Sequence, residues 1–207
     1  MAPNEIRRKT AGLLSERGIA IPSHLPPLDD DVPVRSLNET IDRMLCLTAL
    51  GACAYGFDRE RARRWLASEG VMSCLTASER AFLEKRQGRA EAFQMQIESL
   101  WVLAWSVSLV PSLDMDKPCD DSFVFVMPDL KTDESSQRIR ARARQRPMAE
   151  ILAACDLAYC LHWVIRDREV RGEPAPLEVE PFVIVERRRG LEWLISNDDW
   201  DEVNMDT

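Results

Sequence analysis

The chain has 207 residues, of which 45% are hydrophobic and 30% charged, and its formal net charge is -8 at pH 7. This length and hydrophobic content suit one folded domain with a substantial core and exclude a disordered chain. The acidic balance argues against nucleic acid as a partner, because phosphate binding needs a net basic face. Six cysteines, with no apolar leader segment at the start, predict free thiols and a cytoplasmic protein.

The N-terminal region, residues 1–34, is expected to begin with a helix over 4–17. The apolar positions of this helix are Ile6, Leu13 and Leu14. Four prolines and three consecutive aspartates follow in IPSHLPPLDDDVPV, and they predict an extended connection because proline lacks the backbone N–H that a helix needs. The remaining residues, 35–207, are expected to form the helical body of the same single domain.

Three capping signatures mark the next helix starts. Ser36 with Glu39 three residues later forms the capping-box pattern, and Thr76 with Glu79 repeats it. Asp58 is expected to cap a helix between these two. Glu39 and Arg43 lie one turn apart, a spacing that usually gives only a surface pair.

The stretch 93–110, FQMQIESLWVLAWSVSLV, is expected to form a central core helix that Pro111 ends. Its apolar part is shorter than the roughly 20 residues of a membrane span, so no membrane is expected as a partner. Glu98 enters this apolar run. We expect it to be buried and bonded to an arginine or to His162, because a buried carboxylate must be paired or protonated.

Two later segments are harder to interpret. The run SFVFVM at 122–127 is the one convincing strand candidate, and we expect either a loop packed on the helices or a short hairpin with PFVIV at 181–185. An equal alternative for PFVIV is the start of the last helix. The arginines at alternate positions over 138–146 are expected to form a solvated, mobile linker. An anion-binding patch is the alternative.

A second long helix is expected over 148–171, and a final helix over 185–196. The fold class is therefore mainly α, a single compact helical domain built around two long core helices with at most a small β-hairpin.

A set of charged and polar residues on these helices forms a candidate site. It comprises Arg43, Glu98, Tyr159, His162, Arg166, Glu186 and Arg187. In one interpretation these residues form a buried network that fixes the helix register. In the other, some of them line a pocket in which carboxylates act as general acid and base.

No known catalytic or phosphate-binding motif is present in the sequence. The residues Cys155, Cys160 and His162 lack the usual spacing of metal ligands, so neither a metal nor a cofactor is expected. An elemental analysis free of zinc and iron, with six titratable thiols, is the corresponding expectation.

Several motifs in a fixed order carry a family resemblance. They are Arg35-Ser36 with Glu39 and Arg43, LTASERAFL at 75–83, ESLWVLAWSVSLV at 98–110, DLAYCLHWVIRD at 156–167, VERRRGLEWLI at 185–195 and WDEVNMDT at 200–207. Over most of its length the chain resembles the bacterial domain-of-unknown-function family numbered four-two-seven-two. It departs from the family pattern at Met95, Gln96, Ser106, Ser108 and Cys160. The resemblance implies one largely helical domain and brings no known activity.

The function we expect is that of a non-enzymatic protein-interaction protein, for example an acidic immunity or adaptor protein that binds another bacterial protein with a basic surface. Opposite charges would steer the two together. The candidate partner surface comprises Asp29, Asp30, Asp31, Asp198, Asp199, Trp200 and Asp201. The alternative is a small-molecule-binding protein or a hydrolytic enzyme that uses a Glu/His/Arg pocket.

Overall fold

The computed structural model describes residues 2–22, 24–29, 31–85 and 87–206, and within these ranges it contains helices and no strand. The α-helices are α1 Pro3–Glu16, α2 Leu37–Ala54, α3 Arg59–Ser68, α4 Ala77–Lys85, α5 Ala90–Met95, α6 Ile97–Ser106, α7 Gln137–Arg142, α8 Met148–Arg171 and α9 Pro181–Leu194. Short 3-10 turns are η1 Met72–Cys74, η2 Asp121–Phe125, η3 Leu130–Thr132 and η4 Trp200–Glu202. The mainly α fold class is confirmed.

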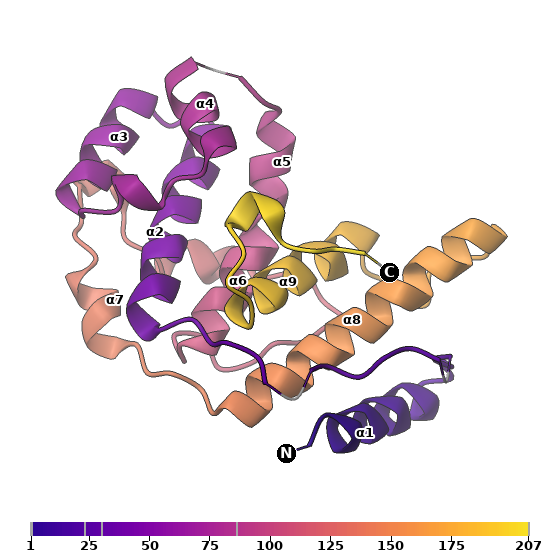
Figure 1. The fold of residues 1–207 in the computed structure, drawn as a ribbon. Coiled ribbons are helices and arrows are strands. Elements are labelled where there is room, and N and C mark those ends of the chain that lie inside the picture. Colours follow the sequence, from indigo (N-terminus) through magenta and orange to yellow (C-terminus); the bar gives the residue numbers. More distant parts are fainter. Residues whose placement is uncertain (1, 23, 30, 86, 207) are drawn as a thin grey trace.

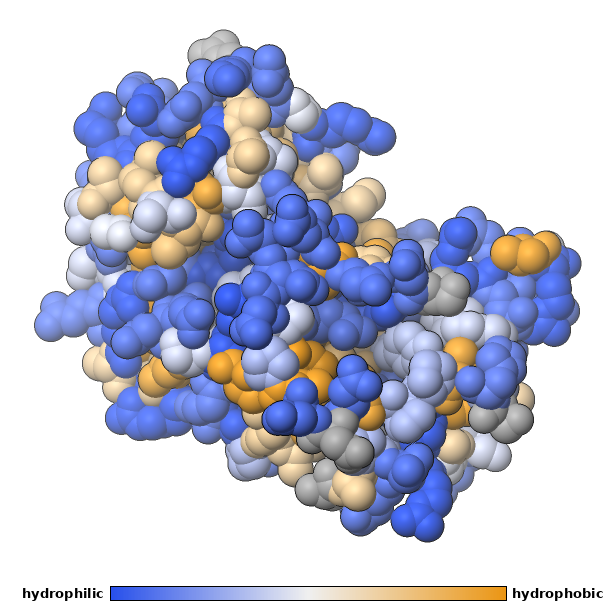
Figure 2. Space-filling model, viewed as in Figure 1, coloured by the Kyte–Doolittle hydropathy of each residue, from blue (hydrophilic) through white to orange (hydrophobic). Residues whose placement is uncertain are grey.

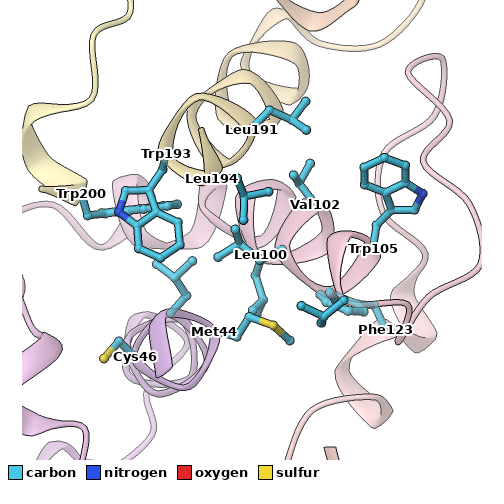
Figure 3. Close-up of a cluster of buried hydrophobic side chains, with 14 of the residues drawn as sticks. Met44, Cys46, Leu100, Val102, Trp105, Phe123, Leu191, Trp193, Leu194 and Trp200 are labelled. Atoms are coloured by element: carbon cyan, nitrogen blue, oxygen red, sulfur yellow. The ribbon is translucent and has the colours of Figure 1, made fainter. Parts of the chain in front are cut away.

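Helix α6 lies in the middle of the fold, between α2 and α9 (Figure 1). Helix α8 packs on α9, and α1 packs on α8. Helices α3, α4 and α5 contact α2. The main core lies where side chains of α2, α6 and α9 meet, with Met44, Leu100 and Leu194 among them (Figure 3).

The predicted helix starts are confirmed, because each has a side chain that accepts a backbone N–H of the first turn. Ser36 and Glu39 form a reciprocal capping box at α2. Thr76 and Glu79 do the same at α4, with Thr76 N donating to Glu79 Oε2 at 2.8 Å and Glu79 N to Thr76 Oγ1 at 3.3 Å. Asp58 caps α3.

The prediction of one central helix over 93–110 is wrong. The segment forms two helices that separate at Gln96, and α6 ends at Ser106, before Pro111. Helix α5 packs mainly on α2, whereas α6 packs most extensively on α9 as well as on α2, so the two pieces have different main neighbours. Of the two long core helices that the sequence predicted, α8 is present with the expected bounds.

The run at 122–127 is no strand, and the hairpin with 181–185 does not form. The run 122–127 contains most of η2. Phe123 is buried against Trp101, with 5.0 Å between the ring centroids, whereas Val124 and Phe125 are exposed. The loop alternative is therefore confirmed. Residues 181–185 begin α9, with Pro181 in the first turn, where its missing N–H costs nothing.

The arginine run is not a mobile linker, because α7 occupies part of it and the side chains at 138, 140, 144 and 146 form hydrogen bonds. Arg140 pairs with Asp42 at 2.5 Å. Arg146 donates to the carbonyls of Trp105 at 2.6 Å and of Val110 at 3.0 Å. These bonds satisfy carbonyls at and just beyond the C-terminal end of α6.

The N-terminal helix is confirmed, with one correction to its apolar face. Ile6 and Leu14 are buried, but Leu13 is 55% exposed. Helix α1 is joined to α8 by Arg7, whose Nη2 lies 2.7 Å from a carboxylate oxygen of the buried Asp156.

Most of the molecular face shown in Figure 2 is polar, and its apolar residues gather in a few separate areas.

Helices α6 and α9 approach closely at Gly190. A Cβ at this position would lie 3.2 Å from the carbonyl oxygen of Ser99 and 3.3 Å from Cγ1 of Val102. We expect Gly190→Ala to lower the free energy of unfolding by about 1 kcal/mol in urea denaturation, because overpacking costs about 1–3 kcal/mol and the gain in helix propensity is about 1 kcal/mol.

The matched control is Gly51→Ala on α2, where an added Cβ meets nothing within 4 Å. This change should stabilise the protein slightly, because only the propensity gain remains. Equal effects of the two substitutions would show that the spacing of α6 and α9 does not depend on Gly190.

Candidate functional site

The seven candidate polar residues do not gather at one place. Glu98 and Arg187 form a buried ion pair, with 2.8 Å between Oε2 and Nη2. Arg43 pairs with Glu79 on α4 at 2.8 Å and not with Glu39, so the predicted surface pair is absent. Arg166 is exposed and pairs with Glu169 on the same helix.

The remaining candidates lie in separate surroundings. Glu186 accepts a hydrogen bond from Ser99 at 2.9 Å and pairs with Arg189 at 3.4 Å. Burial raises the pKa of Glu186, and Arg189 opposes that rise. The ring centroid of Tyr159 lies 5.6 Å from Cζ of Arg7 and 4.9 Å from Cζ of Arg188.

The Glu98–Arg187 pair holds the loop that follows α6. Arg187 donates to the carbonyls of Asp114 and Lys117, and Cys119 N donates to Glu98 Oε1 at 2.9 Å. The expectation that Glu98 is buried and bonded to an arginine is confirmed. Glu98 holds the backbone of this loop in place, because both of its carboxylate oxygens accept hydrogen bonds from protein donors.

His162 belongs to a second buried arrangement, centred on Arg188, which the sequence analysis missed. Arg188 Nη1 lies 2.8 Å from His162 Nδ1, and Nη2 donates to the carbonyl of Asp206 at 2.9 Å. Because arginine only donates, Nδ1 must accept, so the imidazole is neutral with its proton on Nε2. Burial, then Arg188 and Arg166, lower the pKa of His162 to about 4. The arginine triplet in VERRRG was the sequence feature that could have pointed to this arrangement.

The buried cysteines are poor nucleophiles in this fold. All six are free, and only Cys74 is exposed. Burial raises the pKa of Cys46 and of Cys160 to about 12, so neither is a thiolate at neutral pH. Within the described residues, no group of three His, Cys, Asp or Glu side chains is placed to hold a metal ion.

The acidic residues proposed as a partner surface are only partly available. Asp29, Asp31, Asp198 and Asp199 are exposed, and Asp30 lies outside the described residues. The prediction that Trp200 belongs to this surface is wrong, because Trp200 is 2% exposed and packs edge-on against Trp193. Asp201 accepts a hydrogen bond from Ser78 at 2.9 Å.

An apolar groove of about 850 Å³ lies elsewhere, between α2, α5 and the loop 124–138. Three of the seven large hydrophobic residues that are exposed among the described residues line it, namely Phe125, Tyr55 and Val124, which are 81%, 74% and 59% exposed. The deeper lining includes Leu47, Phe93, Ile97, Leu100, Met127 and Leu130. Sequence analysis missed this groove, because it forms only when 124–138 folds back on α2.

Helix α8 is long and apolar enough to cross a bilayer, but half of its most apolar window is buried inside the protein. It carries the buried Asp156 and His162, both bonded to arginines of other segments. These contacts fit the core helix of a globular domain.

The Glu98–Arg187 pair gives a stability prediction. Glu98→Ala should lower the free energy of unfolding by about 3 kcal/mol in urea, because it leaves a buried guanidinium without its counter-ion. Glu169→Ala is the control, since it removes an exposed pair with side chains 64% and 52% exposed and should have little effect. Wild-type stability for Glu98→Ala would contradict the pairing.

His162 gives a pH prediction. Its pKa of about 4 in the folded protein is below the unfolded value of about 6.5, so the unfolded chain takes up the proton first. The stability contributed by neutral His162 is full above pH 6.5 and is lost as the pH falls toward 4. His162→Asn keeps an acceptor for Arg188 but does not titrate.

Urea unfolding between pH 6.5 and pH 4 should therefore depend less steeply on pH in His162→Asn than in the wild type. His24→Asn, which changes the other histidine of the chain, serves as the control. An unchanged pH dependence in His162→Asn would contradict the buried neutral imidazole.

The comparisons with known proteins name a family and no activity. No curated protein and no solved structure matches the chain. One family model, described as a domain of unknown function (DUF4272), matches residues 7–203, which is nearly the whole chain. The chain therefore belongs to the DUF4272 family.

Proposed function

We propose that this protein is a non-enzymatic interaction module that binds a basic, amphipathic helix of a partner protein in the groove between α2, α5 and 124–138. The observation that carries the proposal is the gathering of exposed Phe125, Tyr55 and Val124 around one apolar groove. Exposed apolar patches on folded domains mark interaction sites.

A protein segment suits this groove better than a small ligand does. Small-molecule sites enclose most of the ligand surface, whereas the rim residues here project into solvent, with Phe125 81% exposed. An amphipathic helix lays a row of apolar side chains into such a groove and leaves its polar face outside.

The charged residues that line the groove are balanced, with Asp129 and Glu134 beside Lys131 and Arg138, so the net charge of the surrounding segment is what favours a basic partner. The segment 114–134, which supplies Val124 and Phe125, contains seven Asp or Glu residues and two lysines, a net charge of -5. The whole chain carries -8. Lysine or arginine side chains beside the apolar face of the partner helix would complement the acidic segment and speed association.

The alternative Glu/His/Arg pocket has less support. Glu98 and His162 are buried, and their bonding atoms already contact Arg187 and Arg188. Arg166 is exposed on α8. A filled core at these positions favours the interaction module.

The test is a pair of substitutions with matched exposure. Phe125→Asp should abolish partner retention from the native host in a pull-down, because it places a charge in the apolar contact, whereas Val170→Asp should not. Val170 is 82% exposed and lies on α8, outside the groove lining. Both variants should keep the wild-type melting temperature.

A captured partner supports the proposal only if it contains a basic amphipathic helix that binds as an isolated peptide. Peptide binding should weaken with Phe125→Asp and with rising salt, which screens the charges over about 8 Å at physiological ionic strength. Loss of retention on charge reversal at Asp198 and Asp199, with Phe125→Asp unaffected, would move the contact to those aspartates and refute the groove.

A further inference from the structure

The buried Cys46 on α2 and the exposed Cys74 at the end of η1 are neighbours in the fold, although α3 lies between them in the chain. Both donate to one atom, the carbonyl oxygen of Val71. Sγ of Cys46 donates to it at 3.7 Å, and the backbone N of Cys74 donates at 3.0 Å. In Figure 3, Cys46 lies on the opposite side of α2 from Met44, which faces the main core. The thiol of Cys46 is therefore directed at the backbone of η1.

A second, smaller cavity of about 360 Å³ opens beside this pair and shares no lining residue with the groove. Cys74 lines it, and so do Asp42 and Arg43 of α2. Asp42 and Arg43 lie one helical turn before Cys46, so the three side chains share one face of α2. Cys46 therefore lies on the side of α2 that borders the cavity, and Cys74 is open to small molecules that enter it.

The two thiols differ in access and in reactivity. Burial raises the pKa of Cys46 to about 12, although the charge of Arg43 opposes that rise, so this thiol is protonated at neutral pH and shielded from solvent. Cys74 is exposed, so an oxidant in solvent reaches it first. Redox-active cysteines are typically accessible and lie beside a second, resolving cysteine. The Cys46–Cys74 pair has this arrangement.

The turn η1 is the element that can bring the two sulfurs together. The Cα atoms of a disulfide lie about 4.4–6.8 Å apart, so one of the two backbones must be able to adjust. Helix α2 is rigid, with ten buried residues, whereas η1 has three residues and none of them is buried. Cys74 can therefore turn toward Cys46 without opening the core.

We propose that Cys74 and Cys46 form an oxidative modification site, at which hydrogen peroxide converts the two thiols to an intramolecular disulfide. The thiolate of Cys74 attacks the peroxide, an S–O bond forms as the O–O bond breaks, and hydroxide leaves. The sulfur of Cys46 then attacks the resulting sulfenic acid, and the thiol proton of Cys46 departs with the hydroxyl group as water. The two thiols lose two electrons, which reduce the peroxide. The new bond joins α2 to η1 and closes the loop that contains α3.

The test is direct detection of the cross-link. The reduced full chain is treated with hydrogen peroxide, its remaining thiols are blocked with N-ethylmaleimide, and its peptides are analysed by mass spectrometry without reduction. The expected product is a peptide pair linked through Cys46 and Cys74, lighter by two hydrogens than the two separate peptides. The thiol titre of the denatured protein should fall by two from the six of the reduced chain, and dithiothreitol should restore it.

Three variants separate the two roles. Cys46→Ala should abolish the linked peptide pair and leave Cys74 as a sulfenic acid that dimedone traps, because the resolving thiol is gone. Cys74→Ser should leave Cys46 reduced, because no accessible thiol then reacts with the peroxide. The matched control is Cys53→Ala, a change at another buried cysteine of α2, and it should leave the linked pair in place.

Oxidation of wild-type Cys74 to a dimedone adduct or a sulfinic acid, with no link to Cys46, would overturn the proposal. A disulfide between the Cys74 residues of two copies would also overturn it, because Cys46 would then have no role. Phe125→Asp should not alter the yield of the linked pair, so this test and the test of the helix-binding groove can fail independently.

Discussion

Arginine side chains that donate to backbone carbonyls hold the irregular segments of this protein in place. Arg187 fixes the loop after α6 through the carbonyls of Asp114 and Lys117, and Arg188 fixes the C-terminal segment through those of Met205 and Asp206. Arg146 donates to the carbonyl of Trp105 at the end of α6. Helices satisfy their own backbone, but loops packed against a core need outside donors, and the planar guanidinium group supplies up to five.

Three arginines, Arg187 among them, pair with buried acids. Glu98 pairs with Arg187, Asp156 with Arg7 and Glu79 with Arg43, and each acid is at most 1% exposed. Arg7 also donates to the carbonyl of Leu25, so the same bond pattern fixes the N-terminal connection. A buried ion pair contributes little net stability by itself, but loss of one partner is costly because the other charge remains buried. The pairs therefore act mainly by fixing geometry.

This bonding leaves two surfaces available at opposite halves of α2. The groove lies beside the C-terminal half and has an apolar lining, whereas the smaller cavity lies beside the N-terminal half and has a polar lining that includes the exposed Asp198 and Asp199. Both are formed partly by irregular segments, 124–138 and 193–200, that pack against rigid helices. Binding residues often lie on loops held by such a scaffold.

The sequence by itself determined the local features of the fold. The capping residues Ser36, Asp58 and Thr76 set helix starts, and the bounds of α8 follow from its apolar pattern, because caps and periodicity depend on neighbours a few residues away. The burial of Glu98 also followed from its apolar surroundings in the chain.

Only the tertiary structure decided which distant groups meet. The sequence did not reveal that Arg43 selects Glu79 over the nearby Glu39, that Arg188 bonds His162, or that Trp200 is buried. It also did not reveal the break at Gln96 or the groove around Phe125. Each of these depends on contacts between segments far apart in the chain, where packing outweighs the local preference that a sequence pattern reports.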